Sequence, residues 1–440
     1  MTTSTLNPIF ALTEHEFAKQ RDTLNLIASE NYPSPKVLQL LGSVWSNKYA
    51  EGYPGKRYYA GNQFTDQLET FVQQKALQVF DKTGEYGVNV QTLSGSPANA
   101  MVYLTVLEYN DTILSLNLAN GGHLSHLHTT SNYKKFFKHV TYDVAQNMEQ
   151  GHLNYEIDLA DFKAKLEEFK PKLVIIGFSA YPRAYEFAPL CKLAHEHGAL
   201  VLADIAHING LVAANLHDSP FKAGADGADF ITMTTHKTFR GPRAAMIFAK
   251  NYIPEYTWYQ PEKKVDGLIG KINKTIFPGT SGGPHMNKIA AIGQACLEIL
   301  GEDTYPNGIP FAEYSKLTIE TCKALENGLA NGGLEIISPT ENHLCLVKLP
   351  ETTDSWEFQH QLEQVGIITN RNSIPFDTKT AMRPSGMRFG TAALTSRGLT
   401  TEQAFELGNT IGQFACGVIT AEKVSEFVSD LLKKLHWYYS

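Results

Sequence analysis

The spacing of hydrophobic positions predicts several amphipathic helices along the chain. In residues 65–80 the apolar side chains recur three or four positions apart, which places the following on one helix face: Leu68, Phe71, Val72, Ala76, Val79 and Phe80. At Ser96 and Pro97 the sequence predicts a helix start, with the serine as N-cap and the proline in the first helical position. A further helical pattern covers residues 189–197 and ends at Gly198.

Short and nearly continuous apolar runs alternate with these helical patterns. They predict strands over residues 112–118, 173–179, 200–204 and 229–234. A strand that is buried on both faces has this continuous pattern, and its alternation with helices is typical of a parallel sheet. The sequence therefore predicts an α/β fold in which helices cover both faces of a mostly parallel sheet.

The two ends of the chain have a different pattern. Helical stretches at 288–300 and 311–330 precede a predicted strand at 343–349, and two more helical patterns follow at 401–415 and 421–436. The first 65 residues are rich in Tyr, Asn, Pro and Gly, with only short periodic pieces, so we expect them to pack on another surface, such as a second subunit. The expected parts are an N-terminal arm (1–65), a large α/β domain (66–290) and a small α+β domain (291–440).

The composition is that of a folded protein with a large core. Of 440 residues, 43% are hydrophobic and 19% are charged, which argues against general disorder. Aspartate and glutamate (45) outnumber lysine and arginine (38), and the net charge of −7 argues against a nucleic-acid partner. No apolar run approaches the ~18 residues that a membrane span needs, so we expect no membrane association.

Cysteine usage and the N-terminal sequence indicate a compartment. The five cysteines are scattered and lack the C-x-x-C spacing of a zinc or redox motif. A sparse, odd count suits reducing conditions. The first 16 residues contain neither the basic region nor the apolar stretch of a secretory signal, and they are not rich in arginine. We therefore expect a cytoplasmic protein.

Candidate chemistry gathers where predicted strands end, because ligands of open α/β sheets bind outside the carboxyl ends of the strands. Lys237 closely follows the strand predicted at 229–234, and Asp204 ends the strand predicted at 200–204. A desolvated lysine amine can form a Schiff base with an aldehyde, and pyridoxal phosphate also needs an acidic group that keeps its ring nitrogen protonated. The structural alternatives are a lysine that extends from a strand end to solvent or pairs with a carboxylate, and an aspartate that caps a helix or lies in a turn.

Two further segments suit the anionic ends of a small ligand. Residues 94–97 (SGSP) fit a phosphate cup, since Gly95 admits a close backbone approach and Ser96 supplies a hydroxyl at a helix N-terminus. An ordinary capped turn has the same sequence. Arg388 lies among small and apolar residues, which suits bidentate binding of a carboxylate, with a structural ion pair as the alternative.

Three histidines, His123, His126 and His128, lie close together in the sequence. They do not form an H-E-x-x-H pattern, and no carboxylate lies near them in the sequence. We therefore expect no metal site here, and instead one imidazole stacked on a flat ligand.

Nine longer segments carry a more specific pattern. They are 26–32 (LIASENY), 47–61 (NKYAEGYPGKRYYAG), 89–100 (NVQTLSGSPANA), 121–126 (GGHLSH), 179–183 (SAYPR), 204–214 (DIAHINGLVAA), 234–243 (TTHKTFRGPR), 277–285 (FPGTSGGPH) and 385–398 (SGMRFGTAALTSRG). In this order they make the chain resemble the serine hydroxymethyltransferase family from about residue 20 to about residue 400.

The resemblance implies a fold-type-I pyridoxal-phosphate enzyme and an obligate homodimer, alone or paired into a tetramer, with active sites shared between subunits. It implies that Lys237 binds the cofactor covalently, that Asp204 contacts the pyridine nitrogen and that His123 stacks on the ring. Near the ring 3′-oxygen it implies Ser179 and His207. At the phosphate it implies Ser94, Gly95, Ser96 and His236, with Gly282 and Gly283 from the other subunit.

The same resemblance implies how the substrates bind. The amino acid's carboxylate would contact Arg388 and Ser29. Tyr49, Glu51 and Tyr59 would reach the substrate across the dimer, with Glu51 as the proton-transfer group and Tyr59 beside it in catalysis. The folate pocket would include Leu118, Gly122 and Asn372. The implied reaction is reversible: L-serine and tetrahydrofolate give glycine and 5,10-methylene-tetrahydrofolate.

Three short stretches depart from the family's usual pattern. Ala244-Ala245 replaces a common Gly-Gly, Ser281 replaces a common Gln, and Leu127-His128 replaces a common Gly after His126. None removes a reacting group, so the departures bear on folate affinity and substrate range. The alternatives are a folate-independent pyridoxal-phosphate aldolase acting on threonine or phenylserine, and a binding or regulatory homologue without catalysis.

Overall fold

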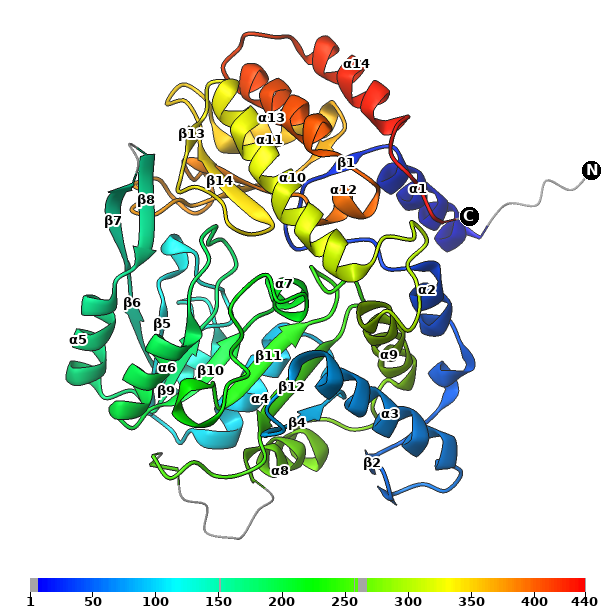
Figure 1. The fold of residues 1–440 in the computed structure, drawn as a ribbon, viewed down its shortest axis with the longest axis vertical. Helices are drawn as coiled ribbons and strands as arrows, with labels where there is room; N and C mark the ends of the chain where they lie inside the picture. Colours follow the sequence, from blue (N-terminus) through cyan, green and yellow to red (C-terminus); the bar gives the residue numbers. More distant parts are fainter. Residues whose placement is uncertain (1–6, 150–151, 257, 260–266, 440) are drawn as a thin grey trace, which may run out of the picture.

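The computed structural model describes residues 7–149, 152–256, 258–259 and 267–439. Among these residues the largest sheet has seven strands (Figure 1), in the order β4 (Tyr86–Asn89), β12 (Ala245–Lys250), β11 (Phe230–Thr234), β10 (Leu200–Asp204), β9 (Leu173–Ile176), β5 (Thr112–Leu116) and β6 (Lys138–Tyr142). The five strands from β11 to β6 are parallel, and β12 is antiparallel to both of its neighbours. The predicted mostly parallel α/β fold is confirmed.

Both faces of this sheet are buried, because successive side chains of a strand point to opposite sides. Along β9, Leu173 and Ile175 belong to one apolar cluster, whereas Val174 and Ile176 belong to another. The first cluster includes residues of α4 (Gly95–Val106) and α8 (Gly267–Lys274). The second includes residues of α3 (Gln63–Phe80), α5 (Leu159–Phe169), α6 (Phe187–Glu196) and α9 (Met286–Leu300).

The C-terminal part has its own sheet and core. The sheet order is β13 (Glu335–Ile336), β14 (Leu344–Lys348), β17 (Gly386–Gly390) and β16 (Asn370–Asn372). The helices of this part are α10 (Phe311–Asn331), α11 (Ser355–Gln364), α12 (Ala392–Ser396), α13 (Thr401–Ala415) and α14 (Ala421–Leu432). Figure 1 shows this part above the large sheet.

The N-terminal segment packs partly on this C-terminal core. Leu24 and Leu26 are fully buried in the same apolar cluster as residues of α10 and α13. The short strand β1 (Leu24–Asn25) pairs in parallel with β15 (Ile367–Ile368). The remaining α-helices and strands of the described residues are α1 (Pro8–Arg21), α2 (Pro35–Leu41), α7 (Asn209–Ala213) and two antiparallel pairs, β2–β3 (Gly52–Tyr53, Lys56–Arg57) and β7–β8 (Val144–Glu149, His152–Ile157). Within the described chain no helix is both long and apolar enough to span a membrane.

Element boundaries differ from the prediction mainly beside the strand ends. β5 and β9 end at Leu116 and Ile176, because the chain turns there into loops. The predicted N-cap Ser96 is wrong: α4 begins at Gly95 with Ser94 as its N-cap, so Pro97 occupies the third position. A proline is still compatible there, since the first four backbone N–H groups of a helix have no partner within it.

Candidate active site

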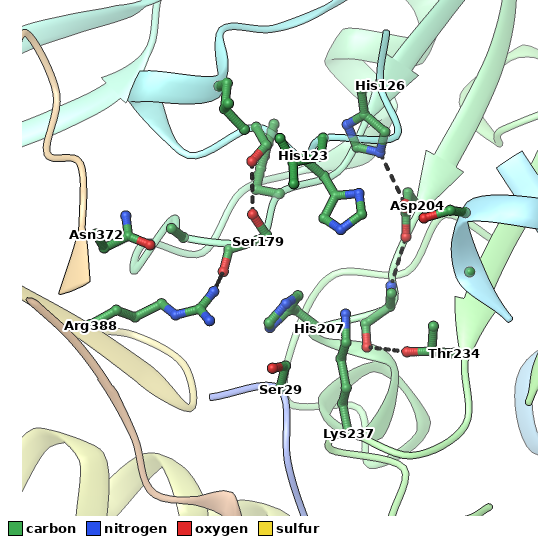
Figure 2. A pocket seen from close by; sticks show the side chains of 18 of the residues that line it. Ser29, His123, His126, Ser179, Asp204, His207, Thr234, Lys237, Asn372 and Arg388 are labelled. Carbon is green, nitrogen blue, oxygen red and sulfur yellow. Dashed lines mark hydrogen bonds and ion pairs between the residues drawn. The ribbon is translucent and has the colours of Figure 1, made fainter. Parts of the chain in front are cut away.

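A cavity of about 510 Å³ lies at the carboxyl ends of the parallel strands (Figure 2). The loops after β5, β9, β10 and β11 form one side of it. The other side comes from Ser29, which follows β1, and from Asn372 and Arg388 on β16 and β17. The cavity therefore lies where the large sheet, the N-terminal segment and the C-terminal part meet.

Asp204, the last residue of β10, is held as an anion. Its Oδ2 accepts hydrogen bonds from Asn99 Nδ2 (2.8 Å) and His126 Nε2 (3.0 Å), and its Oδ1 accepts one from the backbone N–H of Ala206 (3.1 Å). Burial by itself raises the pKa of this carboxyl, but the hydrogen bonds from His126 and Asn99 and the electrostatic interaction with His126 outweigh it, so the pKa lies well below its ordinary value. A fixed negative charge therefore lies at the inner end of the cavity.

Lys237 follows β11, which is the neighbour of β10 in the sheet. Its amine points into the space between Asp204, His123 and His207 (Figure 2). Burial lowers the pKa of this amine from 10.5 to about 8, while the negative charge of Asp204 opposes the shift. A substantial fraction of the amine is therefore neutral and nucleophilic near neutral pH.

The N-terminus of α4 and the loop after β11 form a cup suited to a phosphate. A Cβ added to Gly95 would lie 2.7 Å from Thr234 Cγ2, so only glycine leaves this space open. His236 Nδ1 is buried and has no hydrogen-bond partner among the described residues. Burial lowers the pKa of His236 to about 3, so the ring is neutral. The free N–H groups of the helix and the hydroxyls of Ser94 and Ser96 are donors for an anion.

Two further histidines of the cavity, His123 and His207, are neutral rings. Burial lowers the pKa of His123 to about 4 and that of His207 well below its ordinary value. His123 Nδ1 lies 2.7 Å from Ser125 Oγ, and His207 Nδ1 lies 3.2 Å from His343 Nε2. A neutral imidazole can stack on a heteroaromatic ring without repelling a protonated ring nitrogen. An amine, an acid, a phosphate cup and a flat imidazole together fit pyridoxal phosphate.

Arg388 brings a positive charge into the cavity from β17. Its Nη1 donates a hydrogen bond to the backbone carbonyl of Ser179 (2.5 Å). Burial lowers the pKa of the guanidinium to about 10, which leaves it cationic at neutral pH. No carboxylate among the described residues forms an ion pair with it, so this part of the chain supplies no partner for the alternative of a structural ion pair. A buried cation without an acidic partner suits an anionic ligand.

Fourteen of the predicted site residues line this single cavity: Ser29, Ser94, Gly95, Ser96, Leu118, Gly122, His123, Ser179, Asp204, His207, His236, Lys237, Asn372 and Arg388. They come from segments that are far apart in the sequence. The hydroxyl of Ser179 donates a hydrogen bond to the carbonyl of Gly122 (2.7 Å).

The other five predicted residues form a separate cluster outside this cavity. The hydroxyl of Tyr49 donates to Glu51 Oε1 (3.3 Å), and the rings of Tyr49 and Tyr59 lie 5.2 Å apart. A Cβ added to Gly282 would lie 3.1 Å from Glu51 Oε1, and one added to Gly283 would lie 3.2 Å from Tyr49 Cζ. Tyr49 and Tyr59 are 56% and 50% exposed, so the cluster faces the surface of the chain.

Three charged or titratable residues of the cavity were given no site role from the sequence: His126, Arg243 and Arg371. His126 belongs to the same short segment as His123, and Arg243 ends the segment that contains Lys237, so both lie close in the sequence to predicted site residues. For Arg371 the sequence has no such signal, because its place depends on the pairing of β16 with β17. Within the described part of the chain, no cluster of His, Cys, Asp or Glu could hold a metal ion.

Comparison with known proteins agrees with this arrangement. A family model described as serine hydroxymethyltransferase matches residues 3–411. A relative from Desulfotalea psychrophila, named serine hydroxymethyltransferase, is 42% identical over 424 residues, which cover 95% of this chain and 91% of the relative.

Proposed function

This chain belongs to the serine hydroxymethyltransferase family, and on that premise we propose a role for each group of its cavity. The enzyme depends on pyridoxal phosphate and transfers the hydroxymethyl carbon of serine reversibly to tetrahydrofolate, which gives glycine and 5,10-methylene-tetrahydrofolate. When bound, the cofactor withdraws electrons from the substrate's α-carbon. The observation that most directly supports the assigned roles is the single cavity shared by Lys237, Asp204 and Arg388.

Three groups hold the cofactor in this proposal. Lys237 bonds to its aldehyde carbon, because burial makes the amine neutral far more often than that of an ordinary lysine. Asp204 accepts a hydrogen bond from the ring nitrogen and, as a stable anion, keeps that nitrogen protonated. Ser94, Ser96 and His236 bind the phosphate, and Gly95 gives it room.

Arg388 and Ser29 bind the carboxylate of the amino acid. A guanidinium binds a carboxylate through two parallel hydrogen bonds, which fixes the rotation of the substrate about its α-carbon and so decides which bond breaks. Leu118, Gly122 and Asn372 also line the cavity, and in this proposal they bind the folate.

The site is completed by a second copy of the chain in our proposal. Tyr49, Glu51, Tyr59, Gly282 and Gly283 are clustered, but none of them lines the cavity of Lys237. In a homodimer with shared sites, each chain would supply this cluster to its neighbour's cavity, where Glu51 would move a proton at the substrate hydroxyl. The same region exposes large apolar side chains, which supports an interface there: Val44 (79%), Tyr58 (73%) and Phe64 (65%).

Hybrid dimers test the shared sites. Homodimers of Lys237→Ala and of Glu51→Gln should each have little activity, because every site lacks one essential group. Mixed dimers should recover activity, since one of their two sites combines an intact lysine with an intact glutamate. Verified heterodimers that recover no activity would contradict shared sites.

Product analysis tests the activity itself. The protein, with pyridoxal phosphate, serine and tetrahydrofolate, should form glycine in proportion to the folate consumed. Faster turnover of threonine or phenylserine than of serine with folate would favour the aldolase alternative, which the Leu127-His128 departure motivates. Bound cofactor without any turnover would favour a binding or regulatory homologue.

We also propose a cytoplasmic location. All five cysteines are free thiols, and four of them are buried, which suits a reducing compartment. Localisation of the tagged full chain by fractionation would test this.

A further inference from the structure

We propose that Asn370 is a positioning residue that orients Arg388 and leaves its positive charge free for the substrate carboxylate. The inference rests on the proposed role of Arg388 as the carboxylate binder. It concerns a residue that neither touches the reacting atoms nor lines the cavity.

The register of two strands places Asn370 opposite Arg388. β16 and β17 are antiparallel, and these two residues are direct partners across them. Asn370 Oδ1 accepts hydrogen bonds from Arg388 Nε (3.2 Å) and Nη2 (3.1 Å). With the bond from Nη1 to the Ser179 carbonyl, three of the five guanidinium donors are used. One N–H remains on each terminal nitrogen, and that pair is what bidentate binding of a carboxylate requires.

Both acceptors that hold Arg388 are uncharged. An amide oxygen and a peptide carbonyl fix the plane of the guanidinium without cancelling its charge, whereas an aspartate or glutamate in the same place would form an ion pair. The charge of Arg388 is therefore available to the ligand. A carboxylate at position 370 would compete with the substrate for the same cation.

The amide of Asn370 is itself held in the required orientation. Its Nδ2 donates a hydrogen bond to the backbone carbonyl of Arg371 (2.8 Å), which turns Oδ1 toward Arg388. The hydroxyl of Thr369 donates to the backbone carbonyl of Arg388 (2.7 Å), so the two strands are joined beside the pair. Together these bonds fix the guanidinium before a substrate arrives, which reduces the cost of ordering it on binding.

Substitutions at Asn370 test this in the holoenzyme, with glycine and methylamine as probes. Methylamine has the amine of glycine but no carboxylate, so only glycine reports on Arg388. Asn370→Ala removes the acceptor, and Asn370→Asp keeps an acceptor but adds a competing charge. Gln359→Ala is the matched control, since Gln359 Oε1 accepts hydrogen bonds from the Arg371 backbone N–H (3.0 Å) and Nη1 (3.1 Å) and so supports the same strand without contacting Arg388.

Dissociation constants come from the change in the cofactor absorbance spectrum on titration. We expect Asn370→Ala to weaken glycine binding about tenfold, and Asn370→Asp at least as much, because the aspartate neutralises the cation. Methylamine binding should stay within about twofold in both variants, as should glycine binding in Gln359→Ala. The KM for serine should rise more than kcat falls, because the lost interaction is made in the ground state as well.

Two results would overturn the proposal: unchanged glycine binding in Asn370→Ala, or equal weakening of glycine and methylamine binding. Arg388→Gln separates this failure from failure of the proposed function. If Arg388→Gln weakens glycine but Asn370→Ala does not, only the positioning role is wrong. If Arg388→Gln leaves glycine binding unchanged, the assignment of Arg388 as carboxylate binder is wrong.

Discussion

The amine of Lys237 should lose its proton near pH 8, and this should set the pH at which the apoprotein captures its cofactor. Burial lowers the pKa of the amine to about 8. At about pH 7.5 an amine with that pKa is neutral in roughly a quarter of the molecules, whereas an ordinary lysine is neutral in about one in a thousand. Because only the neutral amine attacks an aldehyde, burial should increase the reactive fraction about 200-fold.

Stopped-flow absorbance can measure this. Cofactor-free protein is mixed with pyridoxal phosphate between about pH 6 and about pH 10, and the same reaction with free Nα-acetyl-lysine corrects for ionisation of the cofactor. The corrected rate constant should rise about tenfold per pH unit below pH 8 and then become level. Lys237→Ala should show no covalent capture.

The Asp204→Asn variant tests whether Asp204 influences the pH midpoint of cofactor capture. The negative charge of Asp204 favours the protonated amine, so its removal should move the midpoint below that of the unsubstituted protein. A corrected rate that still rises at pH 10 would refute the reasoning, because the amine would then titrate as an exposed lysine does. So would a higher midpoint in Asp204→Asn.

The same shift has a consequence for stability without the cofactor. The folded-state pKa of Lys237 is lowered, so between about pH 8 and about pH 10.4 the unfolded chain binds more protons at this residue than the folded chain does. Its contribution to the free energy of unfolding should therefore increase as the pH rises through this window. Compared with Lys237→Met, which cannot titrate, the unsubstituted apoprotein should gain stability with pH there.

Two further predictions concern residues around the sheet. Asp229 and Lys250 are both fully buried with their charged atoms 3.4 Å apart, so Asp229→Asn should lower the free energy of unfolding in urea by about 3–5 kcal/mol. The surface-pair control Asp226→Asn should cost less than about 1 kcal/mol, and equal losses would contradict the argument. Gly95→Ala should speed cofactor release about tenfold, because the added Cβ would lie 2.7 Å from Thr234 Cγ2 and displace the phosphate cup. Unchanged release on gel filtration would show that the helix can shift without cost.

Local sequence patterns predicted the elements that bury one regular face. The pattern at residues 65–80 predicted a helix, and the structure contains that helix as α3. Residues 200–204 form a strand both in the prediction and in the structure. α1 was not predicted, because none of its residues is buried and so it has no apolar stripe. The division of the chain at residues 65 and 290 stays a prediction. The burial of Leu24 and Leu26 in the C-terminal core depends on contacts that no local pattern encodes.

Site residues at strand ends could be found from the sequence, because topology alone brings those ends together. Asp204 and Lys237 are examples, since each closely follows a recognisable strand. Asn370 could not be found in this way. Its role requires the register of β16 on β17, and these strands have short, mixed sequences that do not specify which residues are opposite.

The charges of the side chains that line the cavity explain how residues from separate segments of the chain act together. Its lining contains four cations, Lys237, Arg243, Arg371 and Arg388, and the single carboxylate of Asp204. Burial keeps His123, His207 and His236 neutral, so they add no positive charge at neutral pH. In the proposed function, a phosphate and a carboxylate on the ligands match the cations, and a protonated ring nitrogen matches Asp204. The carboxylate is held by donors, and Arg388 is held by neutral acceptors, so each keeps its full charge for the ligand group of opposite sign.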